Sequence, residues 1–383
     1  MTLTVTGYGC VTPLGAGAAA LRQGWSEGKC GIRTIARFDT SALRVHMGGE
    51  MPDAGAGPGA PPLRGARAVR AALDEALAAS GLPRGTRITA LVATTKGFLE
   101  SGLQIEQEHE AAGVGLPARF VEGELRMRHG MGPVSTLTVS SACASGVAAL
   151  AVALALAESP ATAAVVCVGV DLLSDFVFRG FASLGAMDAA PCRPFDAGRA
   201  GLSASEAAAA MVLEPEDRMR ARGAAPLGRI LGAGLANDAT HPTAPDRDGG
   251  GLARAILDAL REAHVGAESL GHVHAHGTAT VFNDAMELRA LGSCLGAAAQ
   301  RIPVTTLKGA IGHTLGAAGL VEVIGSLEAV RAGELPAVTG LVVAEGDLDV
   351  LRAPRRLARA SFLKTAAGFG GFDAAVVAEG ILP

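Results

Sequence analysis

Aromatic residues and charges are both scarce in this chain of 383 residues. Aromatics make up 3% of it, with one Trp, one Tyr and eleven Phe, so the sequence offers no aromatic surface for stacking on bases or sugars. Charged residues make up 18%, against about 25% in an average protein, and 33 Lys and Arg nearly balance 37 Asp and Glu. Without an excess of positive charge, nucleic acid is not expected as a partner.

Long apolar runs are missing as well. The longest covers residues 147–157, VAALAVALALA, and falls well short of the about 20 residues that a membrane-spanning helix needs. We therefore expect a buried helix and no membrane insertion. The opening MTLTVTGYG begins as a strand and has neither the basic region nor the apolar segment of a secretory signal, which makes the cytoplasm the expected location.

Cysteine patterns typical of metal sites and disulfide frameworks are absent from the sequence. No C-x-x-C pair occurs among the six cysteines, which stand at positions 10, 30, 143, 167, 192 and 294. In a cytoplasmic protein we expect free thiols, most of them buried as small hydrophobic side chains. At most one of them is expected to do chemistry.

Small residues and an alternation of strands and helices dominate what is present. Ala (77) and Gly (52) together make a third of the chain, which suggests close contacts between helices. Strands are predicted at 3–7, 88–94, 162–170, 207–213, 229–236, 273–276, 303–306 and 373–378. Helices are predicted at 16–26, 68–80, 143–158, 251–263, 284–295 and 315–332. This alternation is typical of layered α/β proteins.

Two stretches of the sequence resemble each other and indicate a duplication. Near 137–157 a strand leads through SSACASG into a helix, and near 303–332 a strand leads through KGAIGH into another. Each stretch therefore puts a reactive residue type at a turn from strand to helix. We expect two similar α/β halves that meet at one site.

Cys143 is the leading candidate for a nucleophile. It stands just after a strand and at the start of the Ala-rich helix, where unpaired amides and the helix dipole favour a thiolate. Its small neighbours leave room for a substrate. An inert buried thiol is the alternative.

Three histidines alternate at the end of a predicted strand. His272, His274 and His276 would share one face, so a zinc site is an alternative to be weighed. No acidic or Cys ligand follows at a suitable spacing. His276 leads into the Gly-Thr-Ala-Thr loop, which suits hydrogen bonding to a polar ligand, and it is the histidine that we expect to be functional.

A second reactive turn contains Lys308 and His313 in KGAIGHTLGAAG. The glycines permit close approach of the backbone, but the order of residues differs from a nucleotide-binding P-loop. Glu322 follows in the same helical segment, where it is placed to pair with Lys308 or to orient a histidine. A solvated helix charge is the alternative for Glu322. Near the C-terminus, GFGGFD is a glycine loop that carries Phe369.

These motifs, in this order, resemble the β-ketoacyl-acyl carrier protein synthases, the condensing enzymes of the thiolase superfamily. Nearly the whole chain takes part, through TVTGYGCVTPLG, SSACASG, PFDAGRAG, HAHGTAT, KGAIGHTLGAAG and GFGG. The resemblance is to the elongating enzymes of bacterial fatty acid and type II polyketide synthesis.

The resemblance implies a duplicated thiolase-like fold with five α-β-α-β-α layers, divided into halves at 1–214 and 215–383. It also implies decarboxylative condensation of an acyl group on Cys143 with a malonyl thioester. Substrates would arrive on the phosphopantetheine of acyl carrier protein, with no further cofactor and no metal. The expected assembly is a homodimer, or a heterodimer with a ketosynthase-like subunit.

Roles for single residues follow from the same resemblance. His276 and His313 would stabilise the enolate, and Lys308 with Glu322 would set the geometry around them. Residues expected to contact the substrate arm and the acyl group are Thr278, Thr280 and Phe369, the last also contributing its amide, with that of Cys143, to an oxyanion hole.

Cysteine and histidine usage separates this sequence from other branches of the superfamily. Degradative thiolases need a second Cys near the C-terminus, whereas the last one here is Cys294. Chain-initiating enzymes pair Cys with His and Asn, and chain-length factors lack the nucleophile. The alternatives that remain are an acyltransferase without decarboxylation and a partner subunit of another ketosynthase.

Three departures from the family pattern indicate a specialised enzyme. Asp373 replaces the usual Asn after the last glycine motif. The usual Gly-Phe-Val-x-Gly-Glu-Gly run has become Gly201-Leu202-Ser203-Ala204-Ser205-Glu206-Ala207, which keeps Glu206 but loses two glycines. The region between His46 and Pro133, which in the family caps the pocket and meets the partner subunit, is short.

Overall fold

The computed structural model describes residues 2–54, 56–57, 59–100, 113–159 and 162–383. Across these residues runs one mixed sheet with the order β11-β10-β14-β15-β9-β1-β8-β7-β5-β6. Its N-terminal strands are β1 (Leu3–Thr12), β5 (Ile88–Ala93), β6 (Val134–Val139), β7 (Ala164–Asp171) and β8 (Ala207–Pro215). Its C-terminal strands are β9 (Gly228–Asn237), β10 (His272–His274), β11 (Val304–Thr305), β14 (Ser361–Gly368) and β15 (Phe372–Gly380). Short strand pairs are added by β2 (Gly15–Ala16), β3 (Ile32–Thr34), β4 (Met47–Gly49), β12 (Glu334–Leu335) and β13 (Arg355–Arg356).

The two halves of the sheet have the same topology. Numbered by chain order within each half, the five main strands run 3-2-4-5-1 across the sheet. In both halves the second strand is parallel to the third and fourth, and the fifth is antiparallel to its neighbours. The halves join where Leu3–Val5 of β1 pairs with 228–230 of β9. This repeated topology confirms the duplication predicted from the two similar turns.

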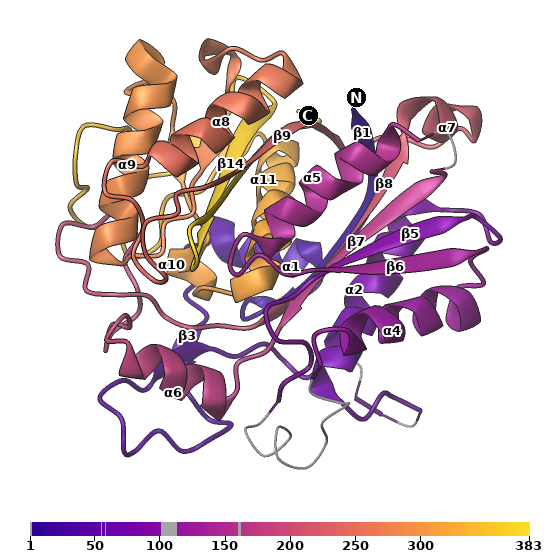
Figure 1. The fold of residues 1–383 in the computed structure, drawn as a ribbon, viewed down its shortest axis with the longest axis horizontal. Coiled ribbons are helices and arrows are strands. Elements are labelled where there is room, and N and C mark those ends of the chain that lie inside the picture. The colour runs from indigo at the N-terminus through magenta and orange to yellow at the C-terminus, as the bar shows by residue number, and fades with distance from the viewer. Residues whose placement is uncertain (1, 55, 58, 101–112, 160–161) are drawn as a thin grey trace.

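Helices form layers on both faces of each half (Figure 1). The central layer, α5 (Ser145–Ala157) and α11 (Ala318–Ala332), packs in one core with strands from both halves. On the outer face of the N-terminal half lie α2 (Arg64–Ser80) and α4 (Leu116–Gly123). On the outer face of the C-terminal half lie α8 (Gly250–Ala263) and α9 (Val281–Leu295). The order is therefore α-β-α-β-α. Further α-helices among the described residues are α1 (Ala18–Ser26), α6 (Asp175–Ser183), α7 (Glu216–Ala221) and α10 (Lys308–Ile311).

Glycine lets the two central helices touch. A Cβ at Gly319 of α11 would lie 2.5 Å from the backbone nitrogen of Val147 in α5, and one at Gly146 would lie 2.9 Å from that of Leu320. Such distances exclude any side chain. The close helix contacts suggested by the Ala and Gly content are therefore present at the centre of the fold.

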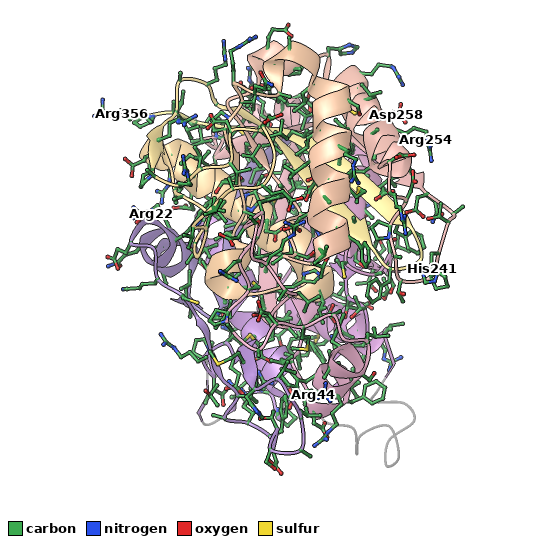
Figure 2. The ribbon with its side chains drawn as sticks, turned by 90° about the vertical axis from the view of Figure 1, so that its left-hand side faces the viewer. Arg22, Arg44, His241, Arg254, Asp258 and Arg356 are labelled. Carbon is green, nitrogen blue, oxygen red and sulfur yellow. The ribbon has the colours of Figure 1, made fainter. Side chains whose placement is uncertain are left out.

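Charged side chains lie mostly on the outside, as Figure 2 shows for Arg22, Arg44, Arg254, Asp258 and Arg356. The apolar run at 147–157 is part of α5, which is packed between the two halves. None of the described helices is long and apolar enough to cross a membrane.

Several predicted boundaries were wrong by a few residues. The strand predicted at 273–276 ends at His274, because the amide of His276 donates to a side chain, Glu287, rather than continuing the ladder. The helix expected to begin at Cys143 begins at Ser145. Strand β14 was not predicted at all, since its sequence SFLKTAAG places a lysine among small residues.

Candidate active site

Cys143 stands on a tight turn between β6 and α5. Ala142, directly before it, has a φ of 48°, a left-handed conformation that costs a residue with a Cβ roughly 1 kcal/mol or more. Ser145 holds this turn, since its Oγ accepts a hydrogen bond from the amide of Ser141 at 2.8 Å and donates one to the oxygen of Ala142 at 2.6 Å. The turn projects the thiol of Cys143 toward a cavity while leaving the residue only 9% exposed.

The electrostatic surroundings of this thiol favour its neutral form at rest. Burial raises the pKa of Cys143 to about 12, while the ammonium groups of Lys308 and Lys96 act in the opposite direction. For this sulfur to act as a nucleophile, its proton would have to leave as the sulfur attacks. The position near the start of α5 assists by placing the positive end of the helix dipole at the sulfur.

His276 and His313 face the same cavity as Cys143. Their rings are perpendicular, with centroids 5.2 Å apart. Burial, the charge of Lys308 and the neighbouring ring hold the pKa of His276 well below its usual value, and burial with the charges of Lys308 and Lys364 does the same for His313. Both rings are therefore neutral near pH 7, and a neutral imidazole donates one N–H and accepts at its other nitrogen.

Backbone contacts fix both histidines. Glu287 on α9 accepts from the amides of His276, at 2.7 Å, and Gly277, at 2.8 Å. His313 donates its amide to the oxygen of Ser203, and its own oxygen accepts from the amide of Ser205 at 3.0 Å. The unusual Ser203-Ala204-Ser205 segment thus supports one of the two histidines directly.

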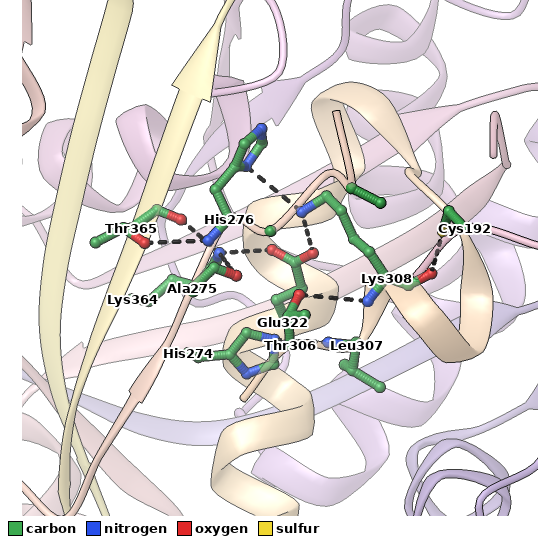
Figure 3. A network of polar contacts seen from close by, with 12 residues as sticks. Cys192, His274, Ala275, His276, Thr306, Leu307, Lys308, Glu322, Lys364 and Thr365 are labelled. Carbon is green, nitrogen blue, oxygen red and sulfur yellow. Dashed lines mark hydrogen bonds and ion pairs between the residues drawn. The ribbon is translucent and has the colours of Figure 1, made fainter. Parts of the chain in front are cut away.

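A buried ionic cluster lies behind His276 (Figure 3). The Nζ atom of Lys308 is 2.5 Å from Oε1 of Glu322 and 3.4 Å from Nδ1 of His276. The predicted pairing of Lys308 with Glu322 is confirmed, and neither residue is a solvated charge. Because an ammonium group only donates, the contact favours the His276 tautomer that carries its hydrogen on Nε2. Lys364 is a second cation beside Glu322, at 2.7 Å from Oε2.

Thr278, Thr280 and Phe369 line the same cavity. The hydroxyl oxygens of the two threonines are 2.9 Å apart, in a loop that Asp284 fixes by accepting from the amide of Ala279 at 3.1 Å. The turn between β14 and β15 carries Phe369. A Cβ at Gly368 would lie 3.1 Å from the nitrogen of Cys143, so this turn packs directly against Cys143.

Phe369 itself is 37% exposed, and its ring centroid lies 6.0 Å from that of Phe181 on α6. Both phenylalanines border the cavity, which has a volume of about 310 Å³. Some of the scarce aromatics therefore line the cavity, whereas others, such as Trp25 and Phe362, are buried in the core.

His272 and His274 are part of the scaffold. Nε2 of His272 and Nδ1 of His274 both contact Oγ of Ser326 on α11, at 3.0 Å and 2.8 Å. Nε2 of His274 accepts from the amide of Leu307 at 3.2 Å. Because both rings contact Ser326, they do not join His276 in a common set of ligands. No cluster of three metal-binding side chains occurs among the described residues.

Three contributors to the site were missed in the sequence: Lys364, Glu287 and Asp284. A lysine inside an otherwise apolar or small-residue strand was the available signal for Lys364. For the two acids the signal was the pair of carboxylates one helical turn apart in NDAMEL, just after the Gly-Thr loop. The departure at Asp373 also borders the cavity. Burial raises its pKa to about 7, and the nearby carboxylate of Asp238 acts in the same direction.

One part of the expected site lies outside the described residues. Residues 101–112, in the shortened region between His46 and Pro133, are not covered. Neighbouring segments of that region, from Arg64 to Ser80 and from Leu116 to Gly123, form the outer helices α2 and α4.

Fold and cavity together define a thiolase-like α/β protein with a cysteine and two histidines at the junction of its halves. The family described as beta-ketoacyl synthase matches over both of its parts, the N-terminal domain at residues 2–218 and the C-terminal domain at 227–341. The chain belongs to the β-ketoacyl synthase family.

Individual relatives match over the full length. The chain is 31% identical to the tetracenomycin polyketide synthase ketoacyl synthase alpha subunit of Streptomyces glaucescens, over 98% of this chain and 96% of that one. It is 29% identical to 3-oxoacyl-acyl-carrier-protein synthase 2 of Synechocystis sp., over 97% and 96%. Among solved structures, the ishigamide ketosynthase/chain length factor is 30% identical with a TM-score of 0.89, covering 99% of both chains.

Proposed function

We propose that this chain is an elongating ketosynthase, which condenses an acyl group on Cys143 with malonyl-acyl carrier protein and releases carbon dioxide. The observation that carries the proposal is the convergence of Cys143, His276 and His313 on one cavity, each neutral at rest. Ketosynthases of fatty acid and polyketide synthesis among the relatives support the same reaction.

In the first half-reaction the sulfur of Cys143 attacks the thioester carbonyl of an acyl carrier protein. A new carbon–sulfur bond forms, the old one breaks, and the proton of Cys143 leaves with the pantetheine thiol. The amides of Cys143 and Phe369 would receive the oxyanion of the tetrahedral intermediate. The packing of Gly368 against the nitrogen of Cys143 supports this pairing.

In the second half-reaction a malonyl thioester binds in the vacated cavity. The bond to its carboxylate breaks, carbon dioxide leaves, and the electron pair forms an enolate on the remaining two carbons. His276 and His313 would each donate an N–H to the enolate oxygen, and the tautomer favoured by Lys308 supplies such a donor on Nε2 of His276.

Condensation then forms the carbon–carbon bond. The enolate carbon attacks the acyl carbonyl, and the bond to Cys143 breaks to return the thiolate, which takes up a proton. Thr278 and Thr280 would hydrogen-bond the pantetheine arm, and Phe369 would gate the entrance beside Phe181. We propose no cofactor beyond the substrates carried by acyl carrier protein.

The proposal also covers the division of the chain into halves, its location and its oligomeric state. The halves are taken as 1–214 and 215–383, and the chain is taken to act in the cytoplasm as a homodimer or with a ketosynthase-like partner. The edge strand β6, with Leu137 50% exposed, supports pairing with a second subunit. Two neighbours of known structure are complexes with chain length factors, which supports the heterodimeric form.

The proposal is tested by intact-protein mass spectrometry after incubation with acyl carrier protein. The chain should gain the mass of the acyl group, and Cys143→Ala should gain none. Cys30→Ala, at a partly buried cysteine outside the cavity, is the matched control and should be acylated normally. Acylation without release of labelled carbon dioxide from malonyl carrier protein would indicate an acyltransferase, and failure of both would indicate a partner subunit.

A further inference from the structure

Lys364 is a buried cation for which the proposed reaction has so far needed no role. It lies in β14 and is fully buried. Its Nζ atom forms an ion pair with Oε2 of Glu322 at 2.7 Å and donates hydrogen bonds to the backbone oxygens of Ala275, at 3.3 Å, and Thr365, at 2.5 Å. In Figure 3 the carboxylate of Glu322 lies between the amino groups of Lys364 and Lys308.

Lysine is rare in this sequence, which makes its use here informative. The chain has four lysines, Lys29, Lys96, Lys308 and Lys364, and the rest of its 33 Lys and Arg residues are arginines. Two of the four share a single carboxylate. Unlike arginine, whose charge is permanent, a buried lysine readily changes its protonation state.

The cluster has an odd number of charges. Glu322 with Lys308 alone would be a neutral pair, whereas Lys364 gives the three ion-paired side chains one net positive charge in surroundings that exclude water. Glu287 is a further carboxylate nearby, but it forms no ion pair with either lysine and accepts instead from the amides of His276 and Gly277. Lys364 also occupies the second oxygen of Glu322, so that this carboxylate is shared between two cations. Lys308 is then less fully neutralised, and it is Lys308 that contacts Nδ1 of His276 at 3.4 Å.

We propose that Lys364 is a positioning residue for decarboxylation. Its ion pair with Oε2 fixes the carboxylate of Glu322, which keeps the amino group of Lys308 in contact with His276, and its positive charge favours the enolate. The inference rests on the proposed function. Lys364 touches no substrate in this account and acts through Glu322 and Lys308. As carbon dioxide leaves, the negative charge of the malonyl carboxylate moves onto the thioester oxygen, so a fixed positive field on the side of His276 assists this step more than substrate binding.

The charges facing Lys364 come from every element around it. Glu322 on α11 and Glu287 on α9 favour its protonated form, and Lys308 on α10 opposes it. The rings of His274, His276 and His313 lie in its field and are held neutral. Burial is the largest effect and lowers the pKa of Lys364 to about 8. The surplus charge is therefore present below about pH 8 and lost above it.

The test measures release of labelled carbon dioxide from carboxyl-labelled malonyl carrier protein between about pH 6.5 and 9.5. The full-length wild type is compared with Lys364→Met, which keeps the volume of the side chain but not its charge. Near pH 7 we expect Lys364→Met to be slower by about tenfold, which corresponds to one charge acting across a few ångströms of protein. The wild-type rate should fall as pH rises through about 8, and the variant should lack that fall.

Acylation of Cys143 separates a catalytic effect from a folding defect. The charges that act most on its thiol are those of Lys308, Asp171, Lys96 and Glu322, so acylation of Lys364→Met should stay within about twofold of wild type. Lys29→Met, at a 59% exposed lysine, is the control for loss of one positive charge and should behave as wild type in both assays.

The outcomes distinguish a positioning role of Lys364 from a purely structural role and from failure of the proposed function. Equal rates and equal pH profiles for wild type and Lys364→Met would overturn the role of Lys364. If neither Lys364→Met nor Lys364→Gln folds, a wild-type rate that does not fall near pH 8 would overturn it as well. Loss of acylation in step with decarboxylation would assign Lys364 a structural role only. Absence of carbon dioxide release from the wild type at every pH would instead contradict the proposed function.

Discussion

The imidazole rings of His276 and His313 stand perpendicular to each other with centroids 5.2 Å apart, although the two residues come from different turns of the C-terminal half. Two neutral rings at this distance can both reach one oxygen atom of a ligand between them and Cys143. The geometry suits stabilisation of one enolate oxygen by two donors.

Replacement of either histidine should therefore separate the two half-reactions. His276→Ala and His313→Ala should each lower release of labelled carbon dioxide by about 100-fold or more, because one donor to the enolate is lost. Acylation of Cys143, measured by mass spectrometry, should persist in both. His272→Ala, at a scaffold histidine, should affect stability more than either half-reaction. A histidine variant with normal decarboxylation would contradict the assignment of donors.

Glu322 should matter for stability as well as activity. In Glu322→Gln the buried amino groups of Lys308 and Lys364 lose their shared carboxylate, and breaking a buried ion pair in this way costs about 3–5 kcal/mol. Urea denaturation should show a correspondingly lower free energy of unfolding. The matched control is Glu334→Gln at an exposed position of β12. An unchanged midpoint for Glu322→Gln would show that the buried charges find other partners.

Close contact of α5 and α11 gives a purely steric prediction. Gly319→Ala introduces a methyl group 2.5 Å from the nitrogen of Val147 and should cost about 1–3 kcal/mol, because neither helix can move without disturbing the core. Gly180→Ala in α6 meets no atom within 4 Å and should be neutral or stabilise by up to about 1 kcal/mol. Thermal unfolding of both variants measures the difference. Equal melting temperatures would contradict the packing.

Asp373 predicts a pH dependence of stability. Its pKa is about 7 in the folded protein, well above the unfolded value of about 3.9, so the folded state holds a proton that the unfolded state has lost. This contribution is present below about pH 4 and is lost as pH rises to about 7. Asp373→Asn has no such proton, and its advantage over wild type should grow between those limits, to the order of 4 kcal/mol. Denaturation curves at several pH values test this, and a constant difference would contradict the assigned pKa.

The duplicated α/β fold could be predicted because local patterns in the sequence indicate its strands, helices and turns. Apolar strands alternate with Ala-rich helices, and two similar turns carry Cys143 and His313, so the duplication and its meeting point followed from the chain itself. Burial of Glu322 was not predictable from its helix alone, since α11 is enclosed on every side by elements distant in the sequence.

The contact of Lys364 with Glu322 is the clearest example of a feature that the sequence did not predict. Its strand has no apolar alternation, and the lysine gains meaning only when β14 lies between β10 and β15, which brings its amino group to Glu322. The same applies to Glu287, whose two carboxylate oxygens reach the amides of His276 and Gly277. A local pattern can mark such a residue as unusual, but the partner that gives it a role is supplied only by the tertiary structure.

The measurement that tests the central claim most directly is the mass of the acyl group on carrier protein after the purified chain has been given both acyl and malonyl carrier proteins. The account predicts a 3-oxoacyl product two carbons longer than the primer, formed together with carbon dioxide and abolished in Cys143→Ala. An elongated product formed equally well by Cys143→Ala would contradict it.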